Sequence, residues 1–234
     1  MKTAVILAGG KGTRLRPYTI SLPKPLVPVG EKPILEIIIS QLKKNGFEHV
    51  IIAVNHQAGI IMAYFEDGAK WGIKITYSLE NQALGTMGPL KLLDEHSLPD
   101  DFLVMNGDVL SDIDYGNFLD QHIQNSAILT VSSYRRIQLV DYGVLETEDG
   151  FLTGFKEKPQ LPYCVSMGVY ALKKEILKFI PKDEYFGFDA LVLKLLKLRQ
   201  KVSVLEYFGY WMDIGRPKDY EQAILDLETG KFLY

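Results

Sequence analysis

Three groups of residues in this chain have the types and spacing that phosphate chemistry requires. A glycine-rich, basic segment runs from Leu7 to Pro17, a lysine stands inside Pro23-Lys24-Pro25, and Asp108 and Asp213 lie far apart in the sequence. Glycine lets the backbone approach a ligand closely, and free N–H groups in such a loop can bind phosphate oxygens. Carboxylates that share a site with phosphates commonly hold Mg²⁺. Together these groups predict a site for a phosphorylated ligand.

The N-terminal loop combines its glycines with cations. Lys11, Arg14 and Arg16 lie beside the glycines. Further along, the two prolines restrict the backbone on both sides of Lys24, so its ammonium group can be aimed at little entropic cost. For this loop alone, the alternative is a glycine turn that carries solvated basic residues.

Two other nucleotide-binding motifs do not fit the same loop. The third glycine of the dinucleotide fingerprint is replaced by Leu15, and the second predicted strand ends in Val54-Asn55, where an acidic residue would be needed. The chain also has no Gly-x-x-x-x-Gly-Lys-Ser/Thr sequence. These absences disfavour an NAD-linked oxidoreductase and a P-loop kinase.

The two aspartates have different local settings. Asp108 follows Asn106-Gly107 at the end of a predicted buried strand, and Asp213 lies within Trp211–Pro217. Taken singly, each could be a turn residue or a helix cap. As a pair from distant segments, they would suit Mg²⁺, which uses one or two protein carboxylates together with substrate phosphates.

Composition limits the function classes. The 234 residues are 47% hydrophobic and 24% charged, with a net charge of −3. This balance is typical of a globular protein, and it offers no general attraction for nucleic acid or an anionic membrane. Cys164 is the only cysteine, and the apolar run Ala4–Ala8 is too short for a signal peptide or a membrane span. We therefore expect a cytoplasmic protein that binds anions at a local site.

The first half of the chain alternates strand-like and helix-like segments. Continuous apolar runs predict strands at 3–8, 50–54, 73–78 and 102–105. Apolar spacing and end signals predict helices at 33–45, 58–65 and 88–93. This alternation indicates a parallel sheet covered on both faces, in which ligands bind beyond the carboxyl ends of the strands.

The second half has a more antiparallel character. Predicted strands at 127–134, 143–146, 151–156 and 163–172 are followed by helices at 189–200 and 217–228. The predicted fold class is α/β, with a doubly wound, mostly parallel, Rossmann-like sheet joined to an antiparallel lobe. Because no Pro-, Gly- or Ser-rich linker is present, we expect one domain over 1–234, with lobes at about 1–125 and about 126–234.

At this point the motifs carry a family resemblance. The sequence Leu-Ala-Gly-Gly-x-Gly-Thr-Arg-Leu-x-Pro from residue 7, followed by Pro-Lys-Pro-Leu-Val-Pro-Val from residue 23, resembles the signature of the sugar-1-phosphate nucleotidylyltransferases. The resemblance implies catalytic phosphate binding by Arg14 and Lys24, and Mg²⁺ binding by Asp108 and Asp213. It also implies nucleotide contacts from a set of loop residues: Leu7, Ala8, Gly9, Gly10, Gly12 and Thr13.

A charged cluster in the second half resembles the family's sugar-binding motif. Glu157-Lys158-Pro159 matches its Glu-Lys-Pro sequence, and Gly143 and Gly168 lie in segments similar to those that approach the sugar. The resemblance implies that Glu157 accepts hydrogen bonds from sugar hydroxyls and that Lys158 binds the sugar phosphate. The alternative is a solvated hairpin end, with the glycines at strand bends.

The base and the sugar depend on a further segment, Glu80–Leu90. It resembles the Leu-Gly-Thr-Ala-Gly-Pro-Leu of mannose-1-phosphate guanylyltransferases, with Met87 in place of the small residue, which implies nucleotide contacts from Gln82, Gly85 and Thr86. GTP is the expected donor, and a mannose or manno-heptose 1-phosphate used for cell-surface polysaccharide is the expected acceptor. A uridylyl-, thymidylyl- or cytidylyltransferase, or a non-catalytic nucleotide-sugar-binding subunit, remains an alternative. We expect no nucleic acid or membrane partner, and a homo-oligomer is open.

Overall fold

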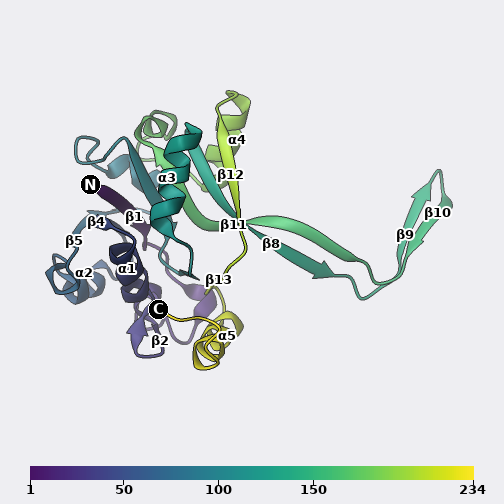
Figure 1. The fold of residues 1–234 in the computed structure, drawn as a ribbon, viewed down its shortest axis with the longest axis horizontal. Coiled ribbons are helices and arrows are strands. Elements are labelled where there is room, and N and C mark those ends of the chain that lie inside the picture. The colour runs from purple at the N-terminus through teal and green to yellow at the C-terminus, as the bar shows by residue number, and fades with distance from the viewer.

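One seven-stranded sheet runs through both halves of the chain in the order β12-β8-β11-β6-β1-β4-β5 (Figure 1). The computed structural model describes residues 1–234. The first-half strands are β1 (Lys2–Leu7), β4 (Phe47–Val54), β5 (Lys74–Leu79) and β6 (Asp101–Asn106). The second half adds β8 (Leu129–Leu139), β11 (Gln160–Lys173) and β12 (Val202–Tyr207). All neighbouring pairs are parallel except those of β11, which runs antiparallel to both β6 and β8.

Helices and short strands complete the fold. The α-helices are α1 (Ile34–Lys44), α2 (Ala58–Phe65), α3 (Tyr115–Asn125), α4 (Phe188–Lys197) and α5 (Pro217–Glu228). The 3-10 helices are η1 (Thr13–Leu15), η2 (Lys24–Leu26), η3 (Ala69–Trp71), η4 (Gly88–Leu92) and η5 (Lys174–Phe179). Three two-stranded sheets pair β2 (Pro28–Val29) with β3 (Lys32–Pro33), β7 (Val109–Ser111) with β13 (Trp211–Asp213), and β9 (Val144–Glu148) with β10 (Phe151–Lys156).

The core lies on both faces of the sheet because successive side chains of a strand point to opposite faces. Ile6 of β1 belongs to a cluster of 36 buried residues that α1, α2, α3 and α5 cover. Its neighbour Val5 belongs to a second cluster of 18, covered by η4, η5 and α4. The result is a three-layer arrangement, in which strands buried on both faces carry continuous apolar runs.

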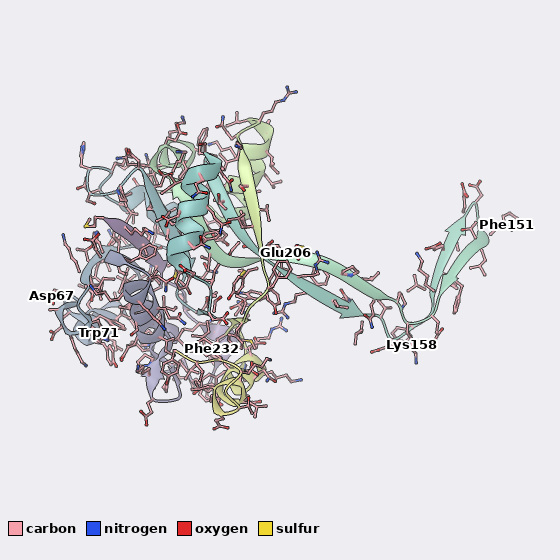
Figure 2. All side chains as sticks on the ribbon, in the orientation of Figure 1. Asp67, Trp71, Phe151, Lys158, Glu206 and Phe232 are labelled. Carbon is pink, nitrogen blue, oxygen red and sulfur yellow. The ribbon has the colours of Figure 1, made fainter.

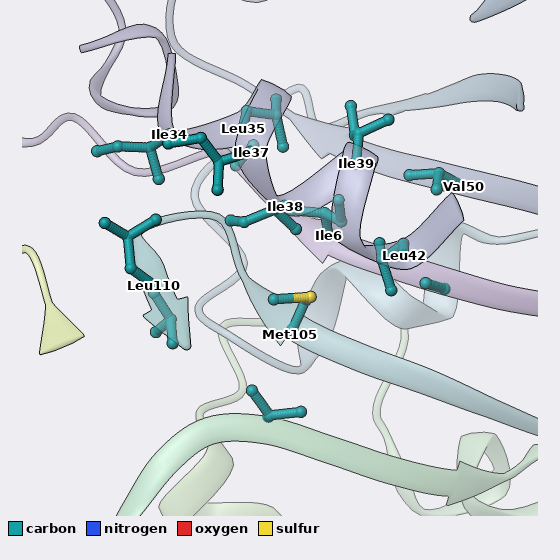
Figure 3. Packing of buried hydrophobic residues seen from close by; sticks show 14 of the residues in the cluster. Ile6, Ile34, Leu35, Ile37, Ile38, Ile39, Leu42, Val50, Met105 and Leu110 are labelled. Carbon is teal, nitrogen blue, oxygen red and sulfur yellow. The ribbon is translucent and has the colours of Figure 1, made fainter. Parts of the chain in front are cut away.

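Helix α1 shows how the sequence builds the first of these layers. Its apolar residues at helical spacing, such as Ile34, Ile38 and Leu42, are fully buried against Ile6 and Met105 of the sheet (Figure 3). Each such side chain contributes roughly 1.5–3 kcal/mol through burial. The helix ends before Gly46, which has a positive φ of 82° as expected just beyond a helix end.

The predicted α/β fold class is confirmed, and several predicted elements match closely. Helices 58–65 and 217–228 and strand 151–156 have the predicted bounds. The differences lie elsewhere: the segment predicted at 88–93 is a 3-10 helix, and the prediction omitted α3, β12, β13 and the short strands β2, β3 and β7. The six-residue strand β12 follows α4 after a four-residue connection and forms an edge of the sheet.

A further difference concerns β8, which continues to Leu139 where the prediction ended at 134, and β11, which starts at Gln160 where the prediction started at 163. Their outer halves leave the sheet as a two-stranded ribbon that ends in the β9–β10 hairpin, and this whole segment projects away from the body (Figure 1). We call residues 135–165 the arm. Nearly all of its side chains are exposed.

None of the helices in this structure combines the length and the apolar content that a membrane crossing requires.

Candidate active site

A cavity of about 390 Å³ opens at the carboxyl ends of β1 and β6, where an α/β sheet is expected to bind ligands. Most of the predicted nucleotide, phosphate and metal residues line it: Leu7, Ala8, Gly9, Gly10, Arg14, Lys24, Gly85, Thr86, Asp108 and Asp213. The topology thus brings together segments from five parts of the chain. Its volume falls within the range typical of small-molecule sites.

Lys24 and Asp108 form an ion pair at the floor of this cavity. Lys24 is only 8% exposed and stands in η2, where Pro23 precedes the helix and the buried Pro25 follows the lysine. Because both flanking residues have restricted backbones, the side chain is held in place before any ligand arrives.

Asp213 lies beside Asp108 because two short strands pair. Asp213 stands directly opposite Val109 in the β13–β7 ladder, and the Ile214 N–H donates to the Asp108 carbonyl oxygen at 3.0 Å. Asp213 is exposed to solvent at the cavity, but the protein atoms around it partly desolvate its carboxylate and raise its pKa, and the Asp108 charge raises it further. Lys24 and Arg14 oppose this shift in the pKa. Two carboxylates far apart in the sequence therefore face one cavity.

Arg14 completes the charged part of the cavity. It is exposed in η1, and its guanidinium group lies near Gly215, where an added Cβ would stand 3.9 Å from the Arg14 Cζ. Unlike Lys24, Arg14 has no carboxylate within ion-pairing distance. Its five N–H donors are therefore available to phosphate oxygens of a ligand.

The donor set of the cavity fits a magnesium ion. Asp108 Oδ1 is buried and has no hydrogen-bond partner, although the other oxygen meets Lys24. A buried oxygen of this kind calls for a missing partner, and a cation would also relieve the repulsion that raises the Asp213 pKa. No cluster of three or more His, Cys, Asp or Glu side chains is present. Two carboxylates suit Mg²⁺, which keeps several waters and binds substrate phosphates.

The predicted base-binding segment forms one wall of the cavity, held by a loop from the second half. The Phe186 carbonyl oxygen accepts hydrogen bonds from the Met87 and Gly88 N–H groups at 2.9 and 3.1 Å. Gly85 has a positive φ of 80°, and an added Cβ would stand 2.8 Å from the same Phe186 oxygen. Only glycine fits both conditions.

Two side chains in this segment have structural contacts as well. The Thr86 hydroxyl, at the cavity wall, accepts a hydrogen bond from the Phe188 N–H at 2.8 Å. Gln82 is exposed and does not line the cavity; its amide donates to the Asp183 carbonyl oxygen at 3.0 Å. Met87, which departs from the family pattern, is fully buried in the second core cluster. It therefore does not change the surface that a base would meet.

The sequence analysis did not single out several residues of this cavity as site residues. These are Pro25, Glu80, Ala83, Leu84, Pro89, Asn106, Gly107 and Tyr185. Glu80 is the most informative, because it is an 8% exposed carboxylate whose pKa is raised by burial and lowered in part by the Leu84 N–H. Glu80 directly follows β5. A search for carboxylates just after predicted strands, which identified Asp108, would therefore also have identified Glu80. No sequence signal marks Tyr185 as a site residue. It lines the cavity because backbone hydrogen bonds join its loop to residues 84–88.

The other glycine-loop residues differ in their position relative to the cavity. Gly12 and Thr13 do not line it; Gly12 has a positive φ of 60°, and its carbonyl oxygen accepts from the Thr19 hydroxyl at 2.7 Å. Gly9 does line it, and an added Cβ there would stand 2.6 Å from Glu80 Oε1. Glycine at this position allows the loop and the carboxylate to lie together.

The predicted sugar-binding residues are not gathered at the cavity. Gly143, Glu157 and Lys158 lie on the arm, at the bend between the ribbon and the β9–β10 hairpin, where Figure 2 labels Lys158. Gly168 lies in the body: it has a φ of 77°, and an added Cβ would stand 2.6 Å from Asn106 Nδ2. Within residues 126–234, the ribbon directs the arm outward from the body (Figure 1).

Comparison with known families agrees with this geometry. Residues 3–230 match the nucleotidyl transferase family. The chain belongs to this family. A relative from Aneurinibacillus thermoaerophilus, D-glycero-alpha-D-manno-heptose 1-phosphate guanylyltransferase, is 34% identical over 96% of this chain and 98% of its own length.

Other members of the nucleotidyl transferase family differ in the base that their names specify. UTP--glucose-1-phosphate uridylyltransferase of Synechocystis is 35% identical over 94% of this chain, and mannose-1-phosphate guanylyltransferase of Mycobacterium tuberculosis is 33% identical over 97%. This chain spans 62% and 65% of the lengths of those two relatives. The crystal structure of HddC from Yersinia pseudotuberculosis complexed with GMP-PN has a TM-score of 0.76, with 28% identity, and the match covers 97% of this chain and 100% of that one.

Proposed function

We propose that this protein transfers a nucleoside monophosphate from an NTP to a sugar 1-phosphate and releases pyrophosphate. The observation that carries the proposal is the cavity in which the glycine loop, Arg14, Lys24, Asp108 and Asp213 meet. The uridylyl- and guanylyltransferases named above support it, since each is a relative of this chain that is named for a sugar 1-phosphate substrate.

The chemistry requires positioning and charge neutralisation more than proton transfer. A phosphomonoester has a second pKa of roughly 6, so the sugar phosphate is mostly a dianion near neutral pH. One of its oxygens forms a bond to the α-phosphorus, the bond from that phosphorus to the bridging oxygen breaks, and pyrophosphate leaves. Arg14 would bind the triphosphate, and the buried Lys24 would hold Asp108 while it offers positive charge to the phosphates.

Asp108 and Asp213 are the residues that would hold Mg²⁺, which supplies Lewis-acid stabilisation of phosphate charge when bound. No general base is needed, because the sugar phosphate is already mostly a dianion near neutral pH, and no histidine lines the cavity.

We propose GTP as the donor, on the position of Glu80. A carboxylate accepts hydrogen bonds at two oxygens, and the edge of guanine offers two adjacent donors, N1–H and the N2 amino group. Uracil and thymine offer a single N–H between two carbonyl oxygens, which a carboxylate would repel. The guanylyltransferase relatives, together with the structural neighbour complexed with GMP-PN, support the same base. The uridylyltransferase relative keeps UTP as the second candidate.

The acceptor that we propose is mannose 1-phosphate or a manno-heptose 1-phosphate, the sugars in the names of the guanylyltransferase relatives.

The proposed function is tested by incubating the chain and Mg²⁺ with each NTP and a panel of sugar 1-phosphates, and measuring the pyrophosphate released. Release that depends on both GTP and one of these sugars is the expected result. Release with UTP or dTTP alone would contradict the guanylyl assignment, and no release with any pair would contradict the transferase.

A further inference from the structure

The hairpin at the end of the arm has one apolar face that nothing in the chain covers. Leu145 stands directly opposite Phe155 in the β9–β10 ladder, and Thr147 stands opposite Leu152. Opposed residues share a face, as do residues two apart along a strand, so Leu145, Leu152 and Phe155 lie together. They are 61%, 62% and 58% exposed. The other face carries the Lys156–Glu146 ion pair at 2.6 Å.

The ribbon that carries this hairpin also lacks a covering layer. In its ladder, Ile137 stands opposite Pro162 and Leu139 opposite Gln160, and the apolar side chains among them are exposed. An isolated two-stranded ribbon is marginally stable at best in water and normally packs against further structure. The arm therefore needs a partner surface.

The base of the arm is fixed on both faces, which sets its direction. On one face Arg135 makes two hydrogen bonds to Glu206 of β12, at 2.8 and 3.3 Å. On the other face the Tyr134 ring lies 5.2 Å from the Trp211 ring, and the Arg136 guanidinium lies 4.9 Å from the same ring. Figure 2 shows Glu206 at this base and Phe151 at the far tip. These contacts fix the direction of the arm, and no arm residue lines the chain's own cavity.

The bend in the arm carries charges suited to a phosphorylated sugar. Glu157 and Lys158 have no ion-pair partner within the chain, in contrast to their neighbour Lys156. Lys158 has a positive φ of 43°, a conformation that is uncommon for a non-glycine residue. Gly143 lies beside them: an added Cβ would stand 2.6 Å from the Phe155 ring and 3.2 Å from Glu157 Oε2. The bend is thus a shaped, charged surface.

The charged residues that line the cavity in the body are Arg14, Lys24, Glu80, Asp108 and Asp213, and none of them belongs to the arm. The cavity's 390 Å³ lies near the lower end of the range for one small-molecule ligand, whereas the proposed reaction joins two substrates. The cations on its wall are already assigned to the triphosphate and to Asp108. The residues that would hold the second substrate must therefore come from elsewhere.

We propose that two copies of this chain exchange arms, so that the apolar face of each arm packs on the other copy and Glu157 and Lys158 complete the partner's cavity. The inference rests on the proposed function for the second substrate, a sugar phosphate. A self-complementary arrangement of this kind gives a twofold dimer.

The exposed surface of the arm is large enough for a dimer. Its aromatic side chains lie on both faces: Phe155 on the apolar face, and Phe151, opposite Glu148, on the other. With Tyr142 and Tyr163, these four side chains are 45% to 79% exposed. At roughly 200 Å² each, they expose on the order of 500 Å² per arm, and two exchanged arms reach about 1,000 Å² before any aliphatic side chain is counted. This is the lower bound for a specific interface.

Complementation between two inactive variants tests the exchange. A Lys24→Ala chain has a defective cavity and an intact arm, and a Lys158→Ala chain has the reverse. If arms are exchanged, a mixed dimer holds one complete site, so an equal mixture that has been unfolded and refolded together should recover about a quarter of wild-type turnover. Mixed dimers that recover no activity would overturn the proposal, because each site would then be built from one chain.

A second experiment tests the interface itself. Leu152→Asp combined with Phe155→Asp should give a folded monomer that still binds GTP with Mg²⁺ in calorimetry, while turnover falls by about 100-fold or more. Ile60→Asp, on the exposed side of α2, is the matched control and should stay dimeric and active. A monomeric double variant with unchanged turnover, or a wild-type monomer in light scattering, would overturn the arm exchange.

The two proposals fail in different ways. A wild-type chain that releases no pyrophosphate with any pair of substrates contradicts the proposed function. Light scattering of the wild type and of the Leu152→Asp, Phe155→Asp variant still supports or overturns the dimer in that case.

Discussion

Arg14 and Lys24 differ in exposure, and this difference separates their tasks. Lys24 is buried against Asp108, so its charge is partly committed to a carboxylate. Arg14 is exposed at the cavity wall, and no acidic side chain holds it. Arg14 is therefore the cation that gains most when a triphosphate enters.

We expect Arg14→Ala to lower kcat by about 100- to 1,000-fold, since loss of one charged donor to a transition state costs about 2.7–4 kcal/mol. Circular dichroism should show an unchanged fold, because the side chain is exposed. The matched control is Arg16→Ala, since Arg16 is exposed nearby but does not line the cavity. Near-normal turnover of the Arg14 variant would contradict the phosphate-binding role.

Glu80 should control the choice of base. Glu80→Gln replaces one acceptor oxygen of the carboxylate with an amide donor. We therefore expect kcat/KM for GTP to fall by about 10- to 100-fold, which corresponds to the loss of one hydrogen bond to a charged group. The ratio of UTP to GTP use should rise. A Glu80→Gln enzyme with unchanged selectivity between the two nucleotides would contradict the reading of guanine by this residue.

The raised pKa of Glu80 adds a pH dependence with a definite sign. Burial favours the protonated form of Glu80 and raises its pKa above the usual 4.5. As pH is lowered, Glu80 therefore takes up a proton earlier than an exposed glutamate would. GMP binding, measured without metal so that Asp108 and Asp213 contribute less, should weaken as pH falls toward that pKa. The Glu80→Gln variant should show a flatter profile. An identical profile in both proteins would contradict this prediction.

At the residue scale, the sequence predicts cavity residues best where glycines or prolines lie next to them. Glycines precede Arg14 and prolines flank Lys24, and the side chains of Arg14 and Lys24 both line the cavity. Tyr185 has no such neighbours, and it reaches the cavity through backbone hydrogen bonds between loops that are far apart in the sequence. Whether Glu157 and Lys158 bind sugar stays a prediction, since the motif says nothing about where the arm points.

At the element scale, α3 is fastened to the sheet by a buried histidine. The ring nitrogens of His122 lie 2.7 Å from the Thr130 hydroxyl of β8 and 3.3 Å from Asp101 Oδ1 of β6. Burial lowers the pKa of His122, and the nearby Asp101 opposes the shift only in part. The neutral ring is therefore the form that the folded protein favours.

This lowered pKa makes the free energy of unfolding depend on pH. The unfolded chain takes up a proton near the usual pKa of 6.5, and the folded chain does so only at lower pH, so stability is complete above 6.5 and lost as pH falls. We expect His122→Gln to reduce the loss seen in urea unfolding between pH 7.5 and 5.5, by at most about 1.4 kcal/mol per pH unit. His49 shifts in the same direction, so part of the loss should remain.

The control for this prediction is His96→Gln, because His96 is exposed and its replacement should leave the pH profile unchanged. An equal change in both variants would contradict the assignment to His122.

The elements that the sequence predicts well are those with strong local signals. The apolar runs of β1, β4 and β6 and the periodic pattern of α1 depend on burial, which the sequence records directly. The outer ribbon of β8 and β11 gives no such signal, because its residues are exposed on both faces and only their mutual pairing makes them strands. The direction of the arm depends on Arg135, Tyr134 and Trp211, whose meeting is a tertiary event.

At the scale of the whole molecule, ligand binding should stabilise the fold, because the cavity joins segments from both halves. GTP with Mg²⁺ at 100 times its Kd should add about 2.7 kcal/mol to the free energy of unfolding. For a chain of this size, the Tm should rise by roughly 5–10 °C. Differential scanning fluorimetry with and without EDTA measures the metal-dependent part.

Asp213→Asn is the matched variant for this measurement. It should keep the fold but lose most of the rise that EDTA abolishes in the wild type, since Asp213 is proposed to hold the metal. A variant with the full EDTA-sensitive rise would contradict that assignment.

The place of β11 between β6 and β8 has a consequence for how the chain is made. On the ribosome, β6 can join β1, β4 and β5 early, but the partner of Met105 is Val169, which is synthesised much later. At 5–20 residues per second, β6 keeps an open, apolar edge for on the order of several seconds. A nascent chain in this state is a substrate for chaperones and a source of aggregates. A fragment cut near residue 125 would keep that edge permanently, so expression of the first lobe alone should yield mainly insoluble protein.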